Sequence, residues 1–138
     1  MAEKPSWLYN QSAAIPYRIN AGILEILLVT TRKRKHWIVP KGVIEPDLSP
    51  QESAAAEAFE EAGVKGCVMP DKVGEYAYTK WGGTCHVRVY LLEVDEVFSD
   101  WPEANLRNRC WLSASDAVSL VDIPALKTMI SHVPEMLL

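Results

Sequence analysis

Three glutamates, Glu57, Glu60 and Glu61, lie close together in a stretch with helical periodicity. At about 100° per residue, their side chains fall within an arc of about 100° on one face. No lysine or arginine lies between residues 50 and 62, and like charges three or four residues apart destabilise a helix by about 0.2–0.5 kcal/mol per pair. A divalent cation held by these carboxylates would remove that repulsion. On periodicity alone, a solvated acidic face is an equal alternative.

The residues around the acids delimit this helix. Ser49 is a good N-cap, Pro50 fits the first helical position, and Glu52 completes an S-x-x-E capping box. Gly63 supplies the left-handed residue that ends the helix. The side opposite the acids is expected to be buried, and it carries Ala55, Ala58, Phe59 and Ala62.

This stretch resembles the Nudix box, G-x(5)-E-x(7)-R-E-U-x-E-E-x-G-U, where U is a bulky aliphatic residue. Gly42 takes its first position, Glu57 the glutamate after the arginine, and residues 60–64 the closing E-E-x-G-U. Two positions depart from the motif, because Leu48 stands at the first glutamate and Ala56 at the arginine. In the family that pair is understood to brace the loop against the helix. Losing both members leaves no unpaired charge.

The resemblance implies a metal-dependent hydrolase that cleaves the P–O–P bond of a nucleoside diphosphate linked to another group. The implied cofactor is Mg²⁺, with Mn²⁺ as the alternative, held by the three glutamates and the Gly42 carbonyl oxygen. Either Glu61 or Glu60 is the expected general base, with Glu103 and Glu75 as outside candidates. The implied fold is α/β (α+β), a Nudix-type α/β/α sandwich. In it, a mixed sheet carries the box helix on one face and a C-terminal helix on the other.

Cations near the box are the expected phosphate ligands. Residues 32–35 are four consecutive cations in an otherwise acidic chain, and cations beside a metal site would meet a polyanionic substrate. The alternative for this segment is a solvated hairpin tip. Lys41 precedes the box glycine, where its point charge suits a phosphate oxygen. The expected substrate-binding residues are Lys41, Arg32, Lys33, Arg18 and Arg88.

The C-terminal half is similar to the diphosphoinositol polyphosphate phosphohydrolase branch of the Nudix superfamily. The similar residues are D-W-P-E at 100–103, R-x-R-x-W-L at 107–112 and D-A at 116–117. That branch usually has a glycine triplet after the proline, whereas residues 41–43 here are Lys-Gly-Val. The similarity favours diphosphoinositol polyphosphates or dinucleoside polyphosphates as substrates. The alternatives are nucleoside triphosphates, nucleotide sugars, or a regulatory domain that binds a phosphorylated ligand without cleaving it.

Apolar periodicity predicts the other elements. Residues 12–19 and 23–31 are expected to form a hairpin, and Pro16 places its first strand at a sheet edge or a bulge. The further predicted elements are strands at 64–68, 73–80, 85–94 and 107–112, a turn at 69–71, a helix from Ser113 or Ser115 to about Leu120, and a helix from Pro124 towards His132.

Length and composition fit one domain over residues 1–138, of which 1–11 are expected to be a loose arm. The net charge of −4 argues against general nucleic-acid binding, so the expected partner is a small-molecule polyphosphate, and the chain is expected to be a monomer or homodimer. No stretch has the length of a membrane span or the layout of a signal peptide. Cys67, Cys85 and Cys110 are expected to be buried and unpaired, which suits a cytoplasmic protein.

Overall fold

The structure is a computed structural model that describes residues 4–138. Its elements in chain order are a 3-10 helix η1 (Ser6–Tyr9), β1 (Asn10–Asn20), β2 (Ile23–Thr30), β3 (Trp37–Ile38), β4 (Lys41–Val43), α1 (Pro50–Ala62), β5 (Val64–Lys80), β6 (Gly83–Val97), β7 (Arg109–Leu112), α2 (Ala114–Leu120) and α3 (Pro124–Met136). The seven strands form one mixed sheet in the order β3-β2-β1-β6-β5, with β4 beside β1 and β7 beside β2. β1 and β6 run parallel, and the other pairs are antiparallel.

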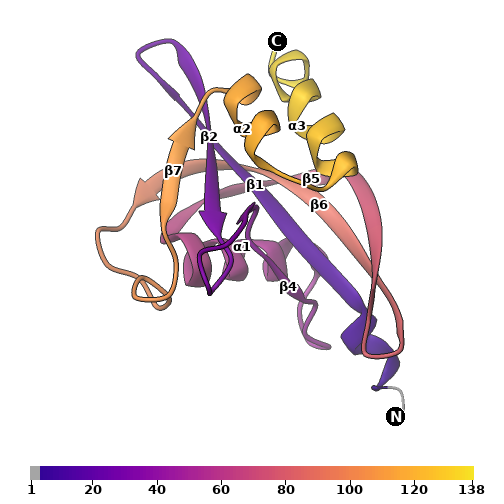
Figure 1. Ribbon diagram of the computed structural model, residues 1–138. Coiled ribbons are helices and arrows are strands. Elements are labelled where there is room, and N and C mark those ends of the chain that lie inside the picture. The colour runs from indigo at the N-terminus through magenta and orange to yellow at the C-terminus, as the bar shows by residue number, and fades with distance from the viewer. Residues whose placement is uncertain (1–3) are drawn as a thin grey trace.

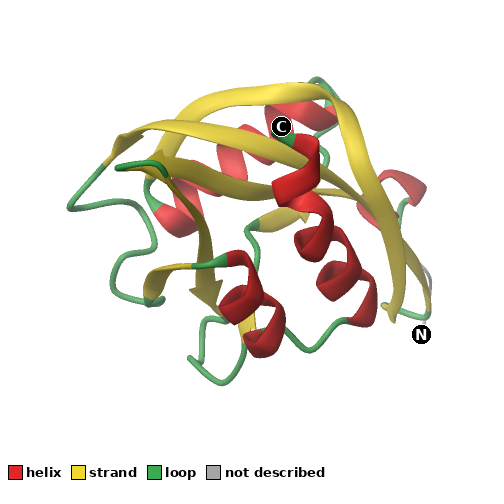
Figure 2. Ribbon diagram, turned by 90° about the horizontal axis from the view of Figure 1, so that it is seen from above, coloured by secondary structure: helices red, strands yellow, loops and turns green. Residues whose placement is uncertain are grey.

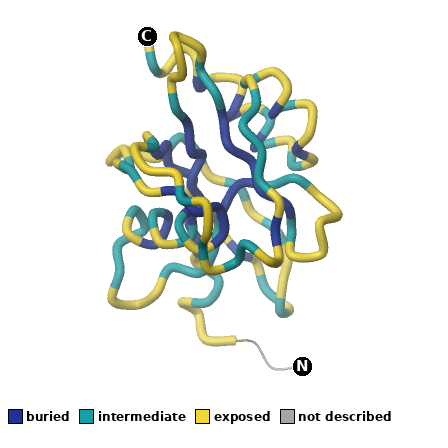
Figure 3. Tube along the Cα trace, turned by 90° about the vertical axis from the view of Figure 1, so that its left-hand side faces the viewer, coloured by how far each residue is buried: buried dark blue, intermediate teal, exposed yellow. Residues whose placement is uncertain are grey.

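Successive side chains of β1 point to opposite faces of the sheet, and each face packs into its own apolar layer. Ile15 belongs to the core cluster shared with Ile130 of α3 and Ala117 of α2. Ala14 belongs to the second cluster, which includes Ala58 of α1. Figures 1 and 2 show the helices on the two sides of the sheet, and Figure 3 shows the buried segments of the chain gathered between them. The predicted α/β/α sandwich, with the box helix and a C-terminal helix on opposite faces, is confirmed.

The boundaries of α1 are as predicted. The Ser49 side chain accepts from the Glu52 backbone N–H, the Glu52 carboxylate accepts in return from the Ser49 N–H, and Gly63 has a φ of 67°. The buried face is rotated from the predicted one. It includes Glu61, whereas Ala55 and Phe59 are only half-buried. Part of the acidic side packs against β4, where the Lys41 N–H donates to Glu61, whereas Glu60 stays exposed.

The prediction for Pro16 is wrong, because β1 lies in the middle of the sheet. The partner on one side of β1 changes at this point, since β4 pairs with residues 11–13 and β2 with residues 17–20. The Ala14 N–H donates to Pro40 O on that side, and alternation along the strand would aim a donor at position 16 the same way. Pro16, which has no N–H to donate, therefore lies between the segments of β1 that pair with β4 and with β2.

Three other expectations also need correction. β5 is one continuous strand with register shifts between Val68 and Gly74, where a turn at 69–71 was predicted. Residues 6–11 of the expected loose arm form η1 and the start of β1, and residues 1–3 lie outside the described residues. Cys67 is exposed, whereas Cys85 is buried and Cys110 half-buried; all three are free thiols. Within residues 4–138, no helix has the length and apolarity to cross a membrane.

Candidate active site

A cleft of about 370 Å³ opens where the acidic face of α1 meets β4, the loop before β7 and the tip of the β5–β6 hairpin. Acidic and basic side chains line it together, which is an arrangement suited to a charged ligand and a cation. Its lining residues are Gln11, Arg32, Lys41, Gly42, Val43, Glu45, Glu57, Glu60, Glu61, Lys80, Trp81, Glu103 and Arg107.

Two carboxyl groups in this cleft touch. Glu61 is 5% exposed, and Glu57, one helical turn earlier, shares a hydrogen bond with it. Burial raises the pKa of Glu57 to about 9, and the hydrogen bond and charge of Glu61 add to that shift. Burial also raises the pKa of Glu61, although its hydrogen bond with Glu57, the charge of Arg107 and the Lys41 N–H oppose the shift. Neighbouring buried carboxylates ionise together only when positive charge compensates them.

Strand β4 lies beside the Glu57–Glu61 pair and forms one wall of the cleft. Gly42 pairs with Ser12 of β1, and the neighbouring Lys41 N–H donates to Glu61 Oε1 at 3.3 Å. A Cβ atom at position 42 would overlap the carboxylate of Glu57. Only glycine lets the strand backbone approach this closely.

The donor set fits a hard cation. Within residues 4–138, no three acidic, histidine or cysteine side chains form a ready-made metal-ligating cluster. Glu57 and Glu61 offer two adjacent carboxylates beside the Gly42 backbone, and Glu60 is exposed at the same cleft. Mg²⁺ binds proteins through one or two carboxylates and keeps its other positions for water and substrate phosphates. These residues therefore fit Mg²⁺, the cofactor that the resemblance to the Nudix box implies.

Arg107 belongs to this site although the sequence analysis did not select it. Its side chain is 7% exposed and forms ion pairs with Glu61 at 3.6 Å and Glu103 at 2.9 Å. It also donates to Thr30 O at 2.9 Å, which anchors it to the end of β2. In the sequence, Arg107 begins the R-x-R-x-W-L run at 107–112, and its spacing from Glu103 suits an ion pair four residues apart. That spacing does not reveal the long-range contact with Glu61.

Lys41 points into a short hydrogen-bonded chain. Its Nζ donates to Tyr78 Oη at 3.1 Å, and the Tyr78 hydroxyl donates to Gln11 Oε1 at 2.8 Å. Burial lowers the pKa of Lys41, and the charge of Glu61 opposes that shift. The sequence did not predict these two hydrogen bonds, because each joins residues 30 or more positions apart in the chain.

The structure brings only some of the predicted cations to the cleft. Lys41 and Arg32 line it, and Arg32 lies 3.5 Å from Glu103. Lys33 is exposed and outside the lining. The other two form ion pairs elsewhere on the sheet: Arg18 with Glu25 at 2.8 Å and Arg88 with Glu75 at 3.7 Å. Of the two outside candidates for the base, Glu103 lies in the cleft and Glu75 does not.

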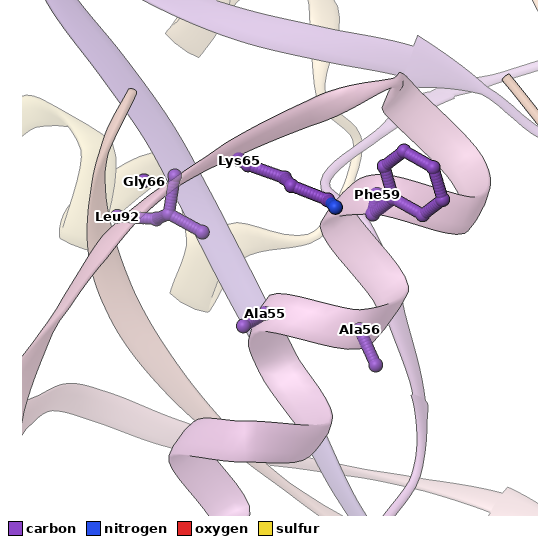
Figure 4. A pocket seen from close by; sticks show the side chains of 6 residues that line it. All are labelled: Ala55, Ala56, Phe59, Lys65, Gly66 and Leu92. Atoms are coloured by element: carbon purple, nitrogen blue, oxygen red, sulfur yellow. The ribbon is translucent and has the colours of Figure 1, made fainter. Parts of the chain in front are cut away.

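A second hollow, of about 340 Å³, lies on another face of α1 (Figure 4). It is lined mainly by apolar side chains, with Lys65 at its edge over the ring of Phe59. Ala56, where the family motif has arginine, lines this hollow and not the acidic cleft. The change at Ala56 therefore lies outside the lining of the acidic cleft.

Fold and cleft together define an α/β/α protein with an acidic, cation-compatible site beside a phosphate-compatible wall. The chain belongs to the NUDIX family, since residues 9–133 match the NUDIX domain. The family membership inferred from the box is thus confirmed.

Named relatives agree with this family. The chain is 35% identical to Nudix hydrolase 13, mitochondrial, of Arabidopsis thaliana over 107 residues, which cover 70% of this chain and 53% of that protein. It is 37% identical to diphosphoinositol polyphosphate phosphohydrolase 2 of Rattus norvegicus over 102 residues, covering 70% and 54% of the two chains. The chain thus spans just over half the length of these two relatives. A crystal structure of a C. elegans Ap4A hydrolase superposes with a TM-score of 0.75 at 22% identity, covering 94% of this chain and 98% of that one.

Proposed function

We propose that the chain is a divalent-metal-dependent hydrolase of phosphoric anhydrides. The observation that carries the proposal is the contact of the buried Glu61 carboxyl with the half-buried Glu57 carboxyl, beside the Gly42 backbone in a cleft with cationic walls. The relatives' names, diphosphoinositol polyphosphate phosphohydrolase and Ap4A hydrolase, favour diphosphoinositol polyphosphates or dinucleoside polyphosphates as substrates. The cleft supports substrates that carry several phosphates, because Lys41, Arg32, Lys80 and Arg107 all line it.

Mg²⁺ or Mn²⁺ bound at this site would neutralise the non-bridging phosphate oxygens and lower the pKa of the attacking water. Glu57 and Glu61 would hold the ion, with Glu60 as a third ligand directly or through water. Glu61 or Glu60 would take the proton from the water. Lys41 and Arg32 would bind phosphate oxygens and fix the P–O–P bond against the acid pair.

A substrate panel tests the proposal. The chain is incubated with Mg²⁺ or Mn²⁺ and a diphosphoinositol polyphosphate, a dinucleoside polyphosphate, a nucleoside triphosphate and a nucleotide sugar. Products are followed by phosphorus NMR in ¹⁸O-enriched water, which identifies the phosphorus that water attacks. Metal-dependent cleavage of at least one anhydride supports the proposal. Measurable binding of these ligands with no turnover on any of them would favour a binding domain.

The basic segment before β3 offers a matched pair of variants. Arg32→Glu is expected to raise KM, and the rise is expected to increase with the number of substrate phosphates, because Arg32 lines the cleft. Lys33→Glu makes the same charge change one residue away, outside the lining, so a smaller rise is expected. Steady-state kinetics at fixed ionic strength compare the two. Equal effects of both variants on every substrate would show that only the overall charge of this segment matters.

A cytoplasmic location is part of the proposal. Cys67, Cys85 and Cys110 are all free, which suits a reducing compartment.

A further inference from the structure

The loop between β6 and β7, residues 98–108, lies across the C-terminal end of α1. The last carbonyl groups of a helix have no partner inside it. Here Glu60 O accepts from the Glu103 N–H at 3.0 Å, and Glu61 O accepts from the indole Nε1–H of Trp101 at 2.9 Å. Arg109, the first residue after the loop, donates to Ala62 O at 2.8 Å. One segment thus satisfies three consecutive carbonyls of the turn that carries the catalytic acids.

Arg109 and Trp101 form a single unit at this helix end. The guanidinium lies 4.0 Å from the centre of the Trp101 ring and also donates to Phe98 O at 2.6 Å. The Phe98 N–H in turn donates to Gly63 O at 2.9 Å. A Cβ atom at Gly63 would lie 2.8 Å from both the guanidinium and the indole, so glycine is required for this packing.

No basic residue lies in the last turn of α1 itself. The Arg109 guanidinium therefore supplies the positive charge that the negative end of the helix dipole favours. The two box positions that would carry an ion pair are Leu48 and Ala56, neither of which can form one. Contacts with residues 98–109 hold the C-terminal end of this helix from outside it.

We propose that Trp101 and Arg109 are positioning residues for the acidic site, which fix the last turn of α1 so that the Glu57 and Glu61 carboxylates are held ready for a divalent cation. Neither residue lines the cleft, so both act through the helix backbone. The Trp101 bond ends on the carbonyl of Glu61 itself, which makes it the most direct of these contacts. This inference rests on the proposed function, because it assumes that the cleft binds a cation.

Trp101→Phe removes the indole N–H and keeps an aromatic ring beneath Arg109. Arg109→Lys keeps the charge but cannot reproduce a planar group that donates to several carbonyls at once. We expect each variant to bind Mn²⁺ about 10-fold more weakly, because losing an outer partner of a metal ligand costs about 10–100-fold in affinity. Mn²⁺ binding to the folded chain is measured by electron paramagnetic resonance without substrate. The concentration of Mn²⁺ that gives half-maximal turnover is expected to rise by the same factor.

Trp111→Phe on β7 is the matched control, because its ring also lies under an arginine, Arg18 at 3.9 Å, but not at the end of α1. Thermal melts of all three variants check folding, and Arg109→Lys decides the question if Trp101→Phe does not fold. Weaker Mn²⁺ binding in Trp101→Phe and Arg109→Lys, and not in Trp111→Phe, supports the proposal. Lower melting temperatures with wild-type Mn²⁺ affinity would overturn it. A wild-type chain that neither binds Mn²⁺ nor cleaves any anhydride would instead refute the proposed function.

Discussion

Glu61→Gln is expected to lower kcat by about 10²–10³-fold, the range seen when one preorganised electrostatic group of an active site is removed. Glu61 is the most deeply buried acid in the cleft. It touches Glu57, accepts from the Lys41 N–H and pairs with Arg107. Glutamine keeps the shape but loses the negative charge, so both cation binding and proton acceptance are lost at this position. The measurement is kcat at saturating Mg²⁺ on the best substrate of the panel.

Two further variants show whether the effect belongs to this carboxyl. Glu60→Gln is expected to be less damaging, because Glu60 is exposed at the cleft and not part of the Glu57–Glu61 pair. Glu135→Gln, on the exposed surface of α3, is expected to leave kcat unchanged. A Glu61→Gln chain with near-normal turnover would remove Glu61 from the catalytic set. Loss of turnover in Glu60→Gln alone would move the general base to Glu60.

Local sequence rules predicted the helix that carries the site and failed where the chain makes distant contacts. The cap at Ser49, the glycine stop at Gly63 and the hairpin of residues 12–19 with 23–31 depend on neighbouring residues, and all three are present. Pro16 was misread because its tolerance in a central strand depends on where β4 ends and β2 begins. No local pattern contains that information.

In the cleft, too, local motifs were recognised in the sequence and distant contacts were not. The acids, Gly42 and Lys41 were selected because they lie in or beside one short motif, and all of them line the cleft. The contacts of Arg107 with Glu61 and of Tyr78 with Lys41 were not predicted, since each joins segments more than 35 residues apart in the chain. The charges of Arg18 and Arg88 gave no indication that both form ion pairs elsewhere on the sheet. A cation predicts phosphate binding only when its position in the fold is known.

The metal-free chain is expected to lose stability as pH rises, because the pKa of Glu57 is raised from an ordinary 4.5 to about 9 by burial and by Glu61. Between these values the unfolded chain releases a proton that the folded chain keeps. A raised pKa in the folded state therefore stabilises the protein fully below about pH 4.5, and the benefit disappears as pH approaches about 9. One pKa unit corresponds to about 1.4 kcal/mol, so even a partly screened shift has a measurable effect.

Glu57→Gln removes this titration. In the presence of a chelator we expect its free energy of unfolding to fall less than that of wild type between about pH 5 and about pH 8, by at least about 1 kcal/mol. Urea denaturation at both pH values measures the difference, with Glu135→Gln as the control for loss of an exposed glutamate. Excess Mg²⁺ is expected to reduce the dependence of the wild-type free energy of unfolding on pH. An ion that binds the folded chain and not the unfolded chain stabilises the ionised Glu57–Glu61 pair. Mg²⁺ is expected to leave the pH dependence of Glu57→Gln nearly unchanged. If the unfolding free energies of wild type and Glu57→Gln change equally with pH in the chelator, the Glu57 carboxyl is already ionised without metal. The acid pair would then not depend on a cation for its charge.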